Sequence, residues 1–211
     1  AAAPSCPTAV PEPVAIDSLT LRAGDRYHRA MGAVLAILLR DGTVYVGGEF
    51  SQIGGQARSK IAALDEVTGA ARSWNPGANG AVLTLAFKGN NLLAGGRFTA
   101  LGGVSRNGVA EVDPQDGTVT AWDPGVDPYG GSAQVEALAV TDSVVYVGGS
   151  FAYMGGQRRI GLAALDAATG RATSWAANLD GFAESLALHD TTVIVGGLFW
   201  TVAGQPRASL A

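Results

Sequence analysis

The side chains that could do chemistry are few and widely spread. The 211-residue chain has two histidines, His28 and His189, and one cysteine, Cys6. The histidines lack the short spacing of metal-binding motifs. Cys6 has no second cysteine for an internal disulfide or a thiolate cluster, so we expect a surface thiol near the chain start. Pairing with another chain and lipidation are the alternatives for Cys6. The sequence therefore predicts no metal and no cofactor.

Carboxylates give a second route to chemistry. The stretch "DPQDG" at 113–117 places two of them near a glycine, but it lacks the full calcium-loop pattern, so we expect a turn there. The chain has no G-x-S-x-G nucleophile elbow. A pair of acids for glycoside hydrolysis stays open, because a sequence does not show the distance between two carboxylates. We expect a protein that is not an enzyme.

A recurring segment organises the rest of the chain. The stretch "VYVGGEF" at 44–50 returns as "LLAGGRF", "VYVGGSF" and "VIVGGLF", at intervals of 48, 53 and 48 residues. Arginine, aspartate and tryptophan recur in the same register. Their copies are Arg58, Arg106 and Arg159, then Asp65, Asp113 and Asp166, then Trp74, Trp122 and Trp175. Because several residue types keep step over three or four copies, the chain is a repeat protein.

Each repeat is predicted to form four short strands. In the first repeat these are expected at 34–40, 43–48, 60–64 and about 71–74. The Asp-Gly pair in "RDGT" at 40–43 is typical of a tight hairpin turn, and "DEVTG" at 65–69 is typical of a turn between strands three and four. Short strands separated by turn signals, with no convincing helix, indicate an all-β protein.

The repeat resembles those of kelch-like propellers. A Gly-Gly pair closes strand two, an aspartate starts a turn, and a tryptophan lies in strand four. The fuller pattern is similar to GGxF-type propeller repeats of bacterial extracellular proteins, over roughly residues 14–211. The resemblance implies a β-propeller of about four blades, each a four-stranded antiparallel sheet, in a secreted or cell-surface protein. Standard kelch repeats favour Tyr-Asp where this chain has Leu64-Asp65, so the resemblance implies a fold and no activity.

The repeats divide the chain into an arm and one propeller domain. Residues 1–13 are rich in proline and alanine and look like a linker or the start of a mature secreted protein. The domain, 14–211, has units near 33–80, 81–132, 133–181, and 182–211 plus 14–32. Because 15–34 aligns without gaps on 63–82, we expect the N-terminal segment to complete the last blade and close the ring, which removes free sheet edges. The alternative is a piece of a longer propeller.

The repeated residues are predicted to be structural. The glycine pairs allow close approach of backbones, and the Phe and Trp rows pack between blades. Each repeated arginine precedes an aspartate by seven residues, as Arg58 precedes Asp65. From this spacing we expect bidentate ion pairs that fix the blade register. An anion-binding ring of arginines around the central channel and sugar stacking on the tryptophans are the alternatives.

Departures from the repeat are the better candidates for binding. The second interval is five residues longer (53 against 48), and the surplus lies in 125–133. Insertions in one repeat usually form loops on a binding face, so Asp127 and Tyr129 are candidate contacts. Tyr153 and Trp200 follow the repeated Phe where other copies carry small or polar residues. Exposed aromatics make good contacts, and packing against a neighbouring blade or the N-terminal segment is the alternative.

Composition narrows the class of partner. A net charge of −4 and the lack of a basic patch argue against nucleic acid, and apolar stretches such as 33–39 fall short of the ~20 residues of a membrane span. We therefore expect an extracellular scaffold that binds another protein of a surface assembly. The second hypothesis is a lectin-like module, with Tyr129, Tyr153 or Trp200 stacking on sugar rings. The third is an enzyme, a hydrolase or oxidase, with carboxylates at the channel mouth.

Overall fold

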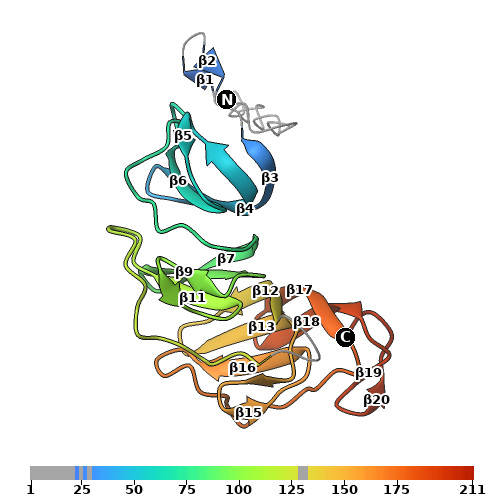
Figure 1. Cartoon of the computed structure of the whole chain (residues 1–211). Helices are drawn as coiled ribbons and strands as arrows, with labels where there is room; N and C mark the ends of the chain where they lie inside the picture. The colour runs from blue at the N-terminus through green and yellow to red at the C-terminus, as the bar shows by residue number, and fades with distance from the viewer. Residues whose placement is uncertain (1–21, 24–25, 28–29, 128–132) are drawn as a thin grey trace, which may run out of the picture.

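The computed structural model describes residues 22–23, 26–27, 30–127 and 133–211, and these residues form strands and turns without a helix. The strands group into small antiparallel sheets, one set for each repeat. We call these sets units 1 to 4, for residues 33–80, 81–132, 133–181 and 182–211. Figure 1 shows the sheets along an open arc, with β3 near one end and β17 and β18 near the other.

Unit 1 shows the plan of the repeat. Its sheet has the order β3 (Met31–Arg40), β4 (Thr43–Ile53) and β6 (Ile61–Asp65), and β5 (Gln56–Ala57) pairs with the end of β4. The predicted Asp-Gly hairpin turn is confirmed, because Asp41 and Gly42 both have positive φ, 50° and 71°. The first strand begins three residues earlier than predicted.

The other units repeat this plan. Unit 2 has β7 (Val82–Lys88), β8 (Asn91–Gly96) and β11 (Val109–Val112); unit 3 has β12 (Gln134–Val140), β13 (Val144–Ser150) and β16 (Leu162–Asp166); unit 4 has β17 (Phe182–His189) and β18 (Thr192–Leu198). After its second strand each of these units carries a short hairpin. The hairpins are β9 (Ala100–Leu101) with β10 (Val104–Ser105), β14 (Tyr153–Met154) with β15 (Gln157–Arg158), and β19 (Thr201–Val202) with β20 (Gln205–Pro206).

The predicted fourth strand is wrong in the first three units. It is reduced to a single bridge, between Leu64 and Ala71 in unit 1, and the equivalent bridges are Val112–Val119 and Leu165–Ala172. The chain leaves the sheet just after this bridge. The indole Nε1 of Trp74 donates a hydrogen bond to the carbonyl oxygen of Asp113 in unit 2, at 2.9 Å. Pro76 then follows and has no N–H to donate to a sheet.

Closure of the ring by the N-terminal segment is not confirmed. In unit 4 Gly196 bridges Leu210, where the third strand of the sheet would start. The two short strands β1 (Arg22–Ala23) and β2 (Arg26–Tyr27) pair with each other, and among the described residues neither pairs with unit 4. The arm 1–13, with Cys6, lies outside the described residues, as do 14–21.

The first glycine of the repeated pair lets two units approach closely in units 1 to 3. A Cβ on Gly47 would lie 2.6 Å from Cγ1 of Val82, which belongs to the first strand of unit 2. A Cβ on Gly95 would meet Val135 of unit 3 at the same 2.6 Å. Such contacts are too short for a real side chain, so these glycines let a valine of the next unit pack against the backbone. The predicted close approach of backbones is confirmed at the second glycine of the pair, because a Cβ on Gly48 would collide with the carbonyl oxygen of Ala33.

Most of the core lies between the units, and one buried cluster, with Val46 and Phe50, lies within unit 1. Tyr45 and Trp74 of unit 1 share one buried cluster with Val82 and Phe98 of unit 2. Tyr45 contacts Trp74 and Phe87 edge to face, with ring centroids 5.5 and 5.7 Å apart. Trp122 and Phe151 fill the junction of units 2 and 3 in the same way. The prediction that these aromatic rows pack between blades is therefore confirmed at both junctions.

Candidate functional site

The repeated arginines contact the main chain, so the predicted ion pairs with the aspartates seven residues on are wrong. The guanidinium of Arg58 donates to the carbonyl oxygen of Arg72, fourteen residues on, at 2.6 Å. The same contact recurs as Arg106–Thr120 and Arg159–Thr173, at 2.7 and 2.6 Å. The chain near these carbonyls has left the sheet, and a fork-shaped guanidinium supplies the missing donors. These arginines are fastened to the backbone, which disfavours an anion-binding ring.

The repeated aspartates hold turns. One carboxylate oxygen of Asp65 accepts hydrogen bonds from the N–H and the hydroxyl of Thr68, at 3.0 and 2.9 Å. These hydrogen bonds from Thr68 lower the pKa of Asp65, and those from Thr169 lower the pKa of Asp166. Asp65 also pairs with Arg72 at 2.9 Å. The aspartates therefore stabilise the loop after strand three.

Two of the predicted contact residues are brought together. The N–H of Asp127 donates to the carbonyl oxygen of Tyr153 at 3.0 Å, and the N–H of Ala152 donates to the carbonyl oxygen of Asp127 at 3.1 Å. The two residues therefore form an antiparallel bridge between the end of unit 2 and the hairpin of unit 3. Asp127 is exposed and the side chain of Tyr153 is 47% exposed.

Asp127 differs from its counterparts in the repeat. Asn79 and Asp180 occupy the same repeat position, and each uses a side-chain oxygen to accept two backbone N–H groups. Those hydrogen bonds lower the pKa of Asp180. Asp127 instead contacts the next unit through its main-chain N–H and carbonyl groups. Its carboxylate has no hydrogen-bond partner among the described residues. Among the described residues this carboxylate thus makes no loop-capping contact of the kind that Asn79 and Asp180 make.

The remaining predicted contacts are not part of this pair. Tyr129 lies outside the described residues. Trp200 is 76% exposed, but it lies in unit 4, before the hairpin of β19 and β20. Its N–H donates to the carboxylate of Asp180, which fixes the backbone and leaves the indole at the surface. Trp200 is therefore not packed against a neighbouring blade in the part of the chain that the structure describes. Packing against residues 1–21 of the N-terminal segment concerns residues outside the described ranges.

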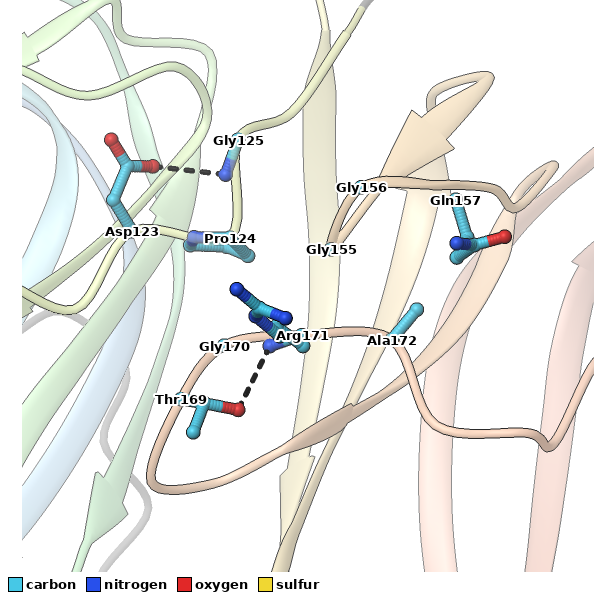
Figure 2. A pocket seen from close by; sticks show the side chains of 10 residues that line it. All are labelled: Asp123, Pro124, Gly125, Gly155, Gly156, Gln157, Thr169, Gly170, Arg171 and Ala172. Carbon is cyan, nitrogen blue, oxygen red and sulfur yellow. Dashed lines mark hydrogen bonds between the residues drawn. The ribbon is translucent and has the colours of Figure 1, made fainter.

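An open cavity of about 650 Å³ adjoins the Asp127–Tyr153 pair. Three segments line it: 123–125, just before Asp127; 155–157, just after Tyr153; and 169–172, in the loop that follows β16. Figure 2 shows these segments facing one another. Four of the lining residues are glycines, so much of the wall is backbone. The cavity therefore lies where units 2 and 3 meet.

Arg171 is the uncompensated charge of the cavity. Its side chain extends toward Pro124 in Figure 2, and among the described residues the guanidinium has no ion pair or side-chain hydrogen bond. The carboxylate of Asp123 is already used, because it pairs with Arg106 at 3.4 Å and accepts the N–H of Gly125 at 3.0 Å. The cavity wall thus offers a cation to a ligand.

Arg171 was missed by the sequence analysis, although the repeat carries a signal for it. The equivalent residues are Ala70 in unit 1 and Thr118 in unit 2, so an arginine at this position is a departure. It lies in a turn whose pattern, "DAATG" followed by Arg171, looked structural. Scanning every column of the repeat for departures, and not only the loop insertion and the residues after Phe, would have found it.

The arrangement is suited to binding. A guanidinium forms strong paired hydrogen bonds with a carboxylate, and an exposed tyrosine adds rigid contact area. In the described ranges no group of three His, Cys, Asp or Glu side chains could hold a metal ion. Nor do those ranges contain a helix of the length and apolarity needed to cross a bilayer.

Comparison with known proteins supports the fold. Residues 39–65 match the family described as "Domain of unknown function (DUF5122) beta-propeller". No curated protein sequence matches the chain. The matched segment spans the end of β3, β4 and β6, which is the repeat that the sequence analysis identified. The chain therefore contains β-propeller repeats.

Solved structures give the same result. The computationally designed Ika4 protein matches with a TM-score of 0.54 and 18% identity, over 90% of this chain and 96% of Ika4. The designed Ika8 protein matches with a TM-score of 0.50 and 19% identity, over 85% of this chain and 52% of Ika8. The WD40 domain of Neurospora crassa Pan2 matches with a TM-score of 0.52 and 16% identity, over 82% of this chain and 49% of that domain's chain. This chain spans about half of the latter two. At these identities the likeness shows an all-β fold of the propeller type and nothing about function.

Proposed function

We propose that the protein is a non-catalytic scaffold that binds another protein at the junction of units 2 and 3. We call this surface the rim site, and define it as Asp127, Tyr153 and the cavity with Arg171. The observation that carries the proposal is the backbone bridge between the exposed residues Asp127 and Tyr153, which lie next in sequence to the segments that line the cavity with Arg171. Charges of both signs around one aromatic anchor are typical of protein-recognition surfaces.

The rim site favours a partner segment of defined chemistry. A carboxylate of the partner would pair with Arg171, and a basic group would pair with Asp127. Tyr153 would cover the apolar part of the segment, and the glycine-rich wall leaves carbonyl and N–H groups for main-chain contacts. Because hairpin and loop are held by backbone hydrogen bonds, the site loses little conformational entropy on binding.

Three further features belong to the same proposal. The protein works outside the cell or at its surface, which the similarity of its repeats to GGxF-type repeats of bacterial extracellular proteins supports. Its repeats are of the kelch-like GGxF type, which the spacing of Gly, Phe, Asp and Trp supports. The rim site performs no catalysis, since its charged groups lack the nucleophile–base pairing of an active site.

Panning a phage-displayed library of random peptides on the full chain tests the proposal. We expect enriched peptides to combine an acidic and a basic residue, and we expect Arg171→Ala and Tyr153→Ala each to weaken their binding at least about tenfold, or ~1.4 kcal/mol. Trp200→Ala is the matched control, because it removes an exposed aromatic from unit 4. If the enriched peptides bind Arg171→Ala and Tyr153→Ala as tightly as they bind the parent chain and the control, the rim site is refuted.

Glycan binding is the second candidate, supported by the exposed indole of Trp200. A large exposed aromatic face is the usual platform for a sugar ring, and the backbone of Trp200 is fixed by Asp180. A glycan array probed with the parent chain and with Trp200→Ala decides this. A signal that the substitution abolishes supports a lectin-like module, and no signal on the array rejects it.

A further inference from the structure

A buried ion pair of unit 2 is connected to both units that form the rim site. The ammonium nitrogen of Lys88 lies 2.9 Å from a carboxylate oxygen of Glu111, and both side chains are largely buried. The ammonium group also donates to the carbonyl oxygen of Ala167 in unit 3, at 2.7 Å. It lies over the ring of Trp122 as well, 4.6 Å from the centroid. The three donors of the lysine thus reach three different partners.

Lys88 holds the wall of the cavity that carries Arg171. Ala167 belongs to the loop after β16, two residues before the lining segment 169–172. In the described ranges no other side chain of unit 2 forms a hydrogen bond with this loop. A hydrogen bond from a charged donor is about twice as strong as a neutral one. Lys88 therefore fixes the place of the loop relative to unit 2.

Glu111 is connected to the opposite wall. Its second carboxylate oxygen accepts the hydroxyl of Thr120 at 2.6 Å, and the oxygen of that hydroxyl accepts the main-chain N–H of Trp122 at 3.2 Å. The segment 123–125, which lines the cavity, follows directly. A buried network of this kind is rigid when its members are all satisfied. One network thus joins the two walls that face each other across the cavity.

The junction of units 1 and 2 holds the equivalent loop in another way. There the indole N–H of Trp74 donates to the carbonyl oxygen of Asp113, the first residue of that loop. At the junction of units 2 and 3 the indole nitrogen of Trp122 is buried and has no hydrogen-bond partner among the described residues. Lys88 therefore takes the place of the indole as the side chain that holds the loop of the following unit.

We propose that Lys88 and Glu111 are positioning residues of the rim site, which set the place of Arg171 relative to the segment 123–125. This role deepens the proposed function and rests on it. Neither residue lines the cavity, so both act through the residues that they hold. The residues equivalent to Glu111 in units 1 and 3 are alanines, so the network belongs to the same junction as the other departures from the repeat. It makes this junction the one that binds.

Lys88→Met combined with Glu111→Ala removes the network without leaving an unpaired charge. We expect this double variant to keep most of its unfolding free energy. It should bind the peptides selected on the rim site at least about tenfold more weakly, because Arg171 is no longer held in place. Arg97→Ala is the matched control, since it breaks an ion pair between units 2 and 3 outside the network. It should bind these peptides like the parent chain.

A double-mutant cycle with Arg171→Ala distinguishes positioning from a general loosening of the chain. If the ion pair acts through Arg171, adding Arg171→Ala to the double variant should weaken peptide binding little further. The total loss is then about tenfold, against about a hundredfold for two independent effects. Fluorescence anisotropy of a labelled peptide measures the affinities, and urea unfolding shows that each variant is folded.

Hydrogen exchange followed by mass spectrometry tests the position of the loop without any peptide. In the double variant we expect the amides of 167–172 to exchange at least about tenfold faster, while those of β8 exchange as in the parent chain. Thr120→Val is the second variant, because it removes the hydroxyl that Glu111 accepts and keeps both charges. It should speed exchange in 123–127 and weaken peptide binding about threefold, and it decides the question if the double variant does not fold.

Three results would overturn the positioning role. They are unchanged exchange in both walls, unchanged peptide affinity of the folded variants, and losses that simply add in the cycle. Failure of the proposed function gives a different result, in which no selected peptide depends on Arg171 or Tyr153. The exchange rates of 167–172 then still decide whether Lys88 and Glu111 hold the loop.

Discussion

Equivalent residues of the repeat form the junction of units 1 and 2 and the junction of units 3 and 4. The tryptophan at this position is buried at the first junction and partly exposed at the second. Trp74 is 5% exposed, and its indole N–H donates to the carbonyl oxygen of Asp113. Trp175, two repeats later, is 37% exposed and contacts Tyr146 edge to face at 5.7 Å. The same residue type in the same register is a core residue at one end of the arc and a surface residue near the other.

The difference shows where burial comes from in this repeat. Trp74 is covered because unit 2 has a third strand, β11, with a turn that begins at Asp113. In the described part of unit 4 the sheet has β17 and β18, and only the bridge at Leu210 marks the place of a third strand. A tryptophan in one unit is therefore buried by the third strand of the unit that follows, as expected for a fold whose units contact their neighbours.

Replacing the two tryptophans should give the largest contrast. Trp74→Ala leaves a cavity between two packed sheets and an unpaired carbonyl at Asp113, so we expect a loss of about 3–5 kcal/mol in unfolding free energy. Trp175→Ala removes an exposed ring with one aromatic contact, and we expect about 1 kcal/mol. Urea unfolding followed by circular dichroism measures both. Equal losses would contradict the claim that the following unit buries this position.

Much of the interior was predictable because it follows the repeat. The glycine pairs predicted close approach between backbones, and the Asp-Gly signal predicted the first hairpin. The fourth strand was not predictable in the same way. Whether Ala71 continues a strand depends on the tertiary hydrogen bond of Trp74 to the next unit, and that contact lies outside any local pattern.

A second comparison concerns a buried ion pair that, within the described ranges, occurs at one junction and not at the other two. Lys88 and Glu111 of unit 2 lie 2.9 Å apart and are largely buried, and the ammonium group also donates to the carbonyl oxygen of Ala167 in unit 3. The residues equivalent to Glu111 in units 1 and 3 are both alanines, Ala63 and Ala164. The pair therefore marks the junction of units 2 and 3 as different from the others.

Removing one partner of this pair should destabilise the chain strongly. Lys88→Met leaves the carboxylate of Glu111 buried, with only the hydrogen bonds of Asn91 and Thr120. We expect a loss of about 2–3 kcal/mol, below the 3–5 kcal/mol typical of broken buried pairs, because those two hydrogen bonds persist. Urea unfolding again gives the measurement.

The double variant Lys88→Met with Glu111→Ala is the control, because it restores the alanine of the other units. It should recover most of the loss, since no charge is left unpaired. A surface pair gives the lower reference: Arg97→Ala, which breaks the partly exposed contact with Glu136, should cost at most about 1 kcal/mol. If Lys88→Met costs no more than Arg97→Ala, the pair does not stabilise the junction.

The sequence predicted Asp127 and Tyr153 of the candidate site but not their pairing, because the pairing depends on the register of the bridge. Asp127 and Tyr153 were each identified as departures from the repeat, yet nothing in the sequence places them together. At the other two junctions the equivalent bridges join Ala78 of unit 1 with Leu101 of unit 2, and Leu179 of unit 3 with Val202 of unit 4. The bridge of Asp127 with Tyr153 is shifted by one residue, and such a shift changes which side chains face outward.

The smallest effect concerns the hairpin turn of unit 4. In units 1 to 3 this two-residue turn is Gly-Gly with positive φ at both residues, as at Gly102 and Gly103, with 60° and 75°. Unit 4 has Ala203 at the first position, with φ of 49°. A residue with a Cβ costs about 1–2 kcal/mol in this conformation. Ala203→Gly removes this cost, but glycine also loses more backbone entropy on folding than alanine does. We therefore expect the substitution to raise the unfolding free energy by a net amount of about 0.5–1 kcal/mol.

Thermal unfolding measures this gain, and Gly102→Ala is the reverse change at the same repeat position. There the new Cβ would also lie 2.8 Å from Cγ2 of Val119, so we expect a loss larger than the gain at Ala203. A stabilising Gly102→Ala, or a destabilising Ala203→Gly, would show that the turns of the two units differ. A gain in stability for Ala203→Gly together with a loss for Gly102→Ala would instead show that both units have the same turn geometry. Unit 4 then adopts this geometry with a strained backbone at Ala203.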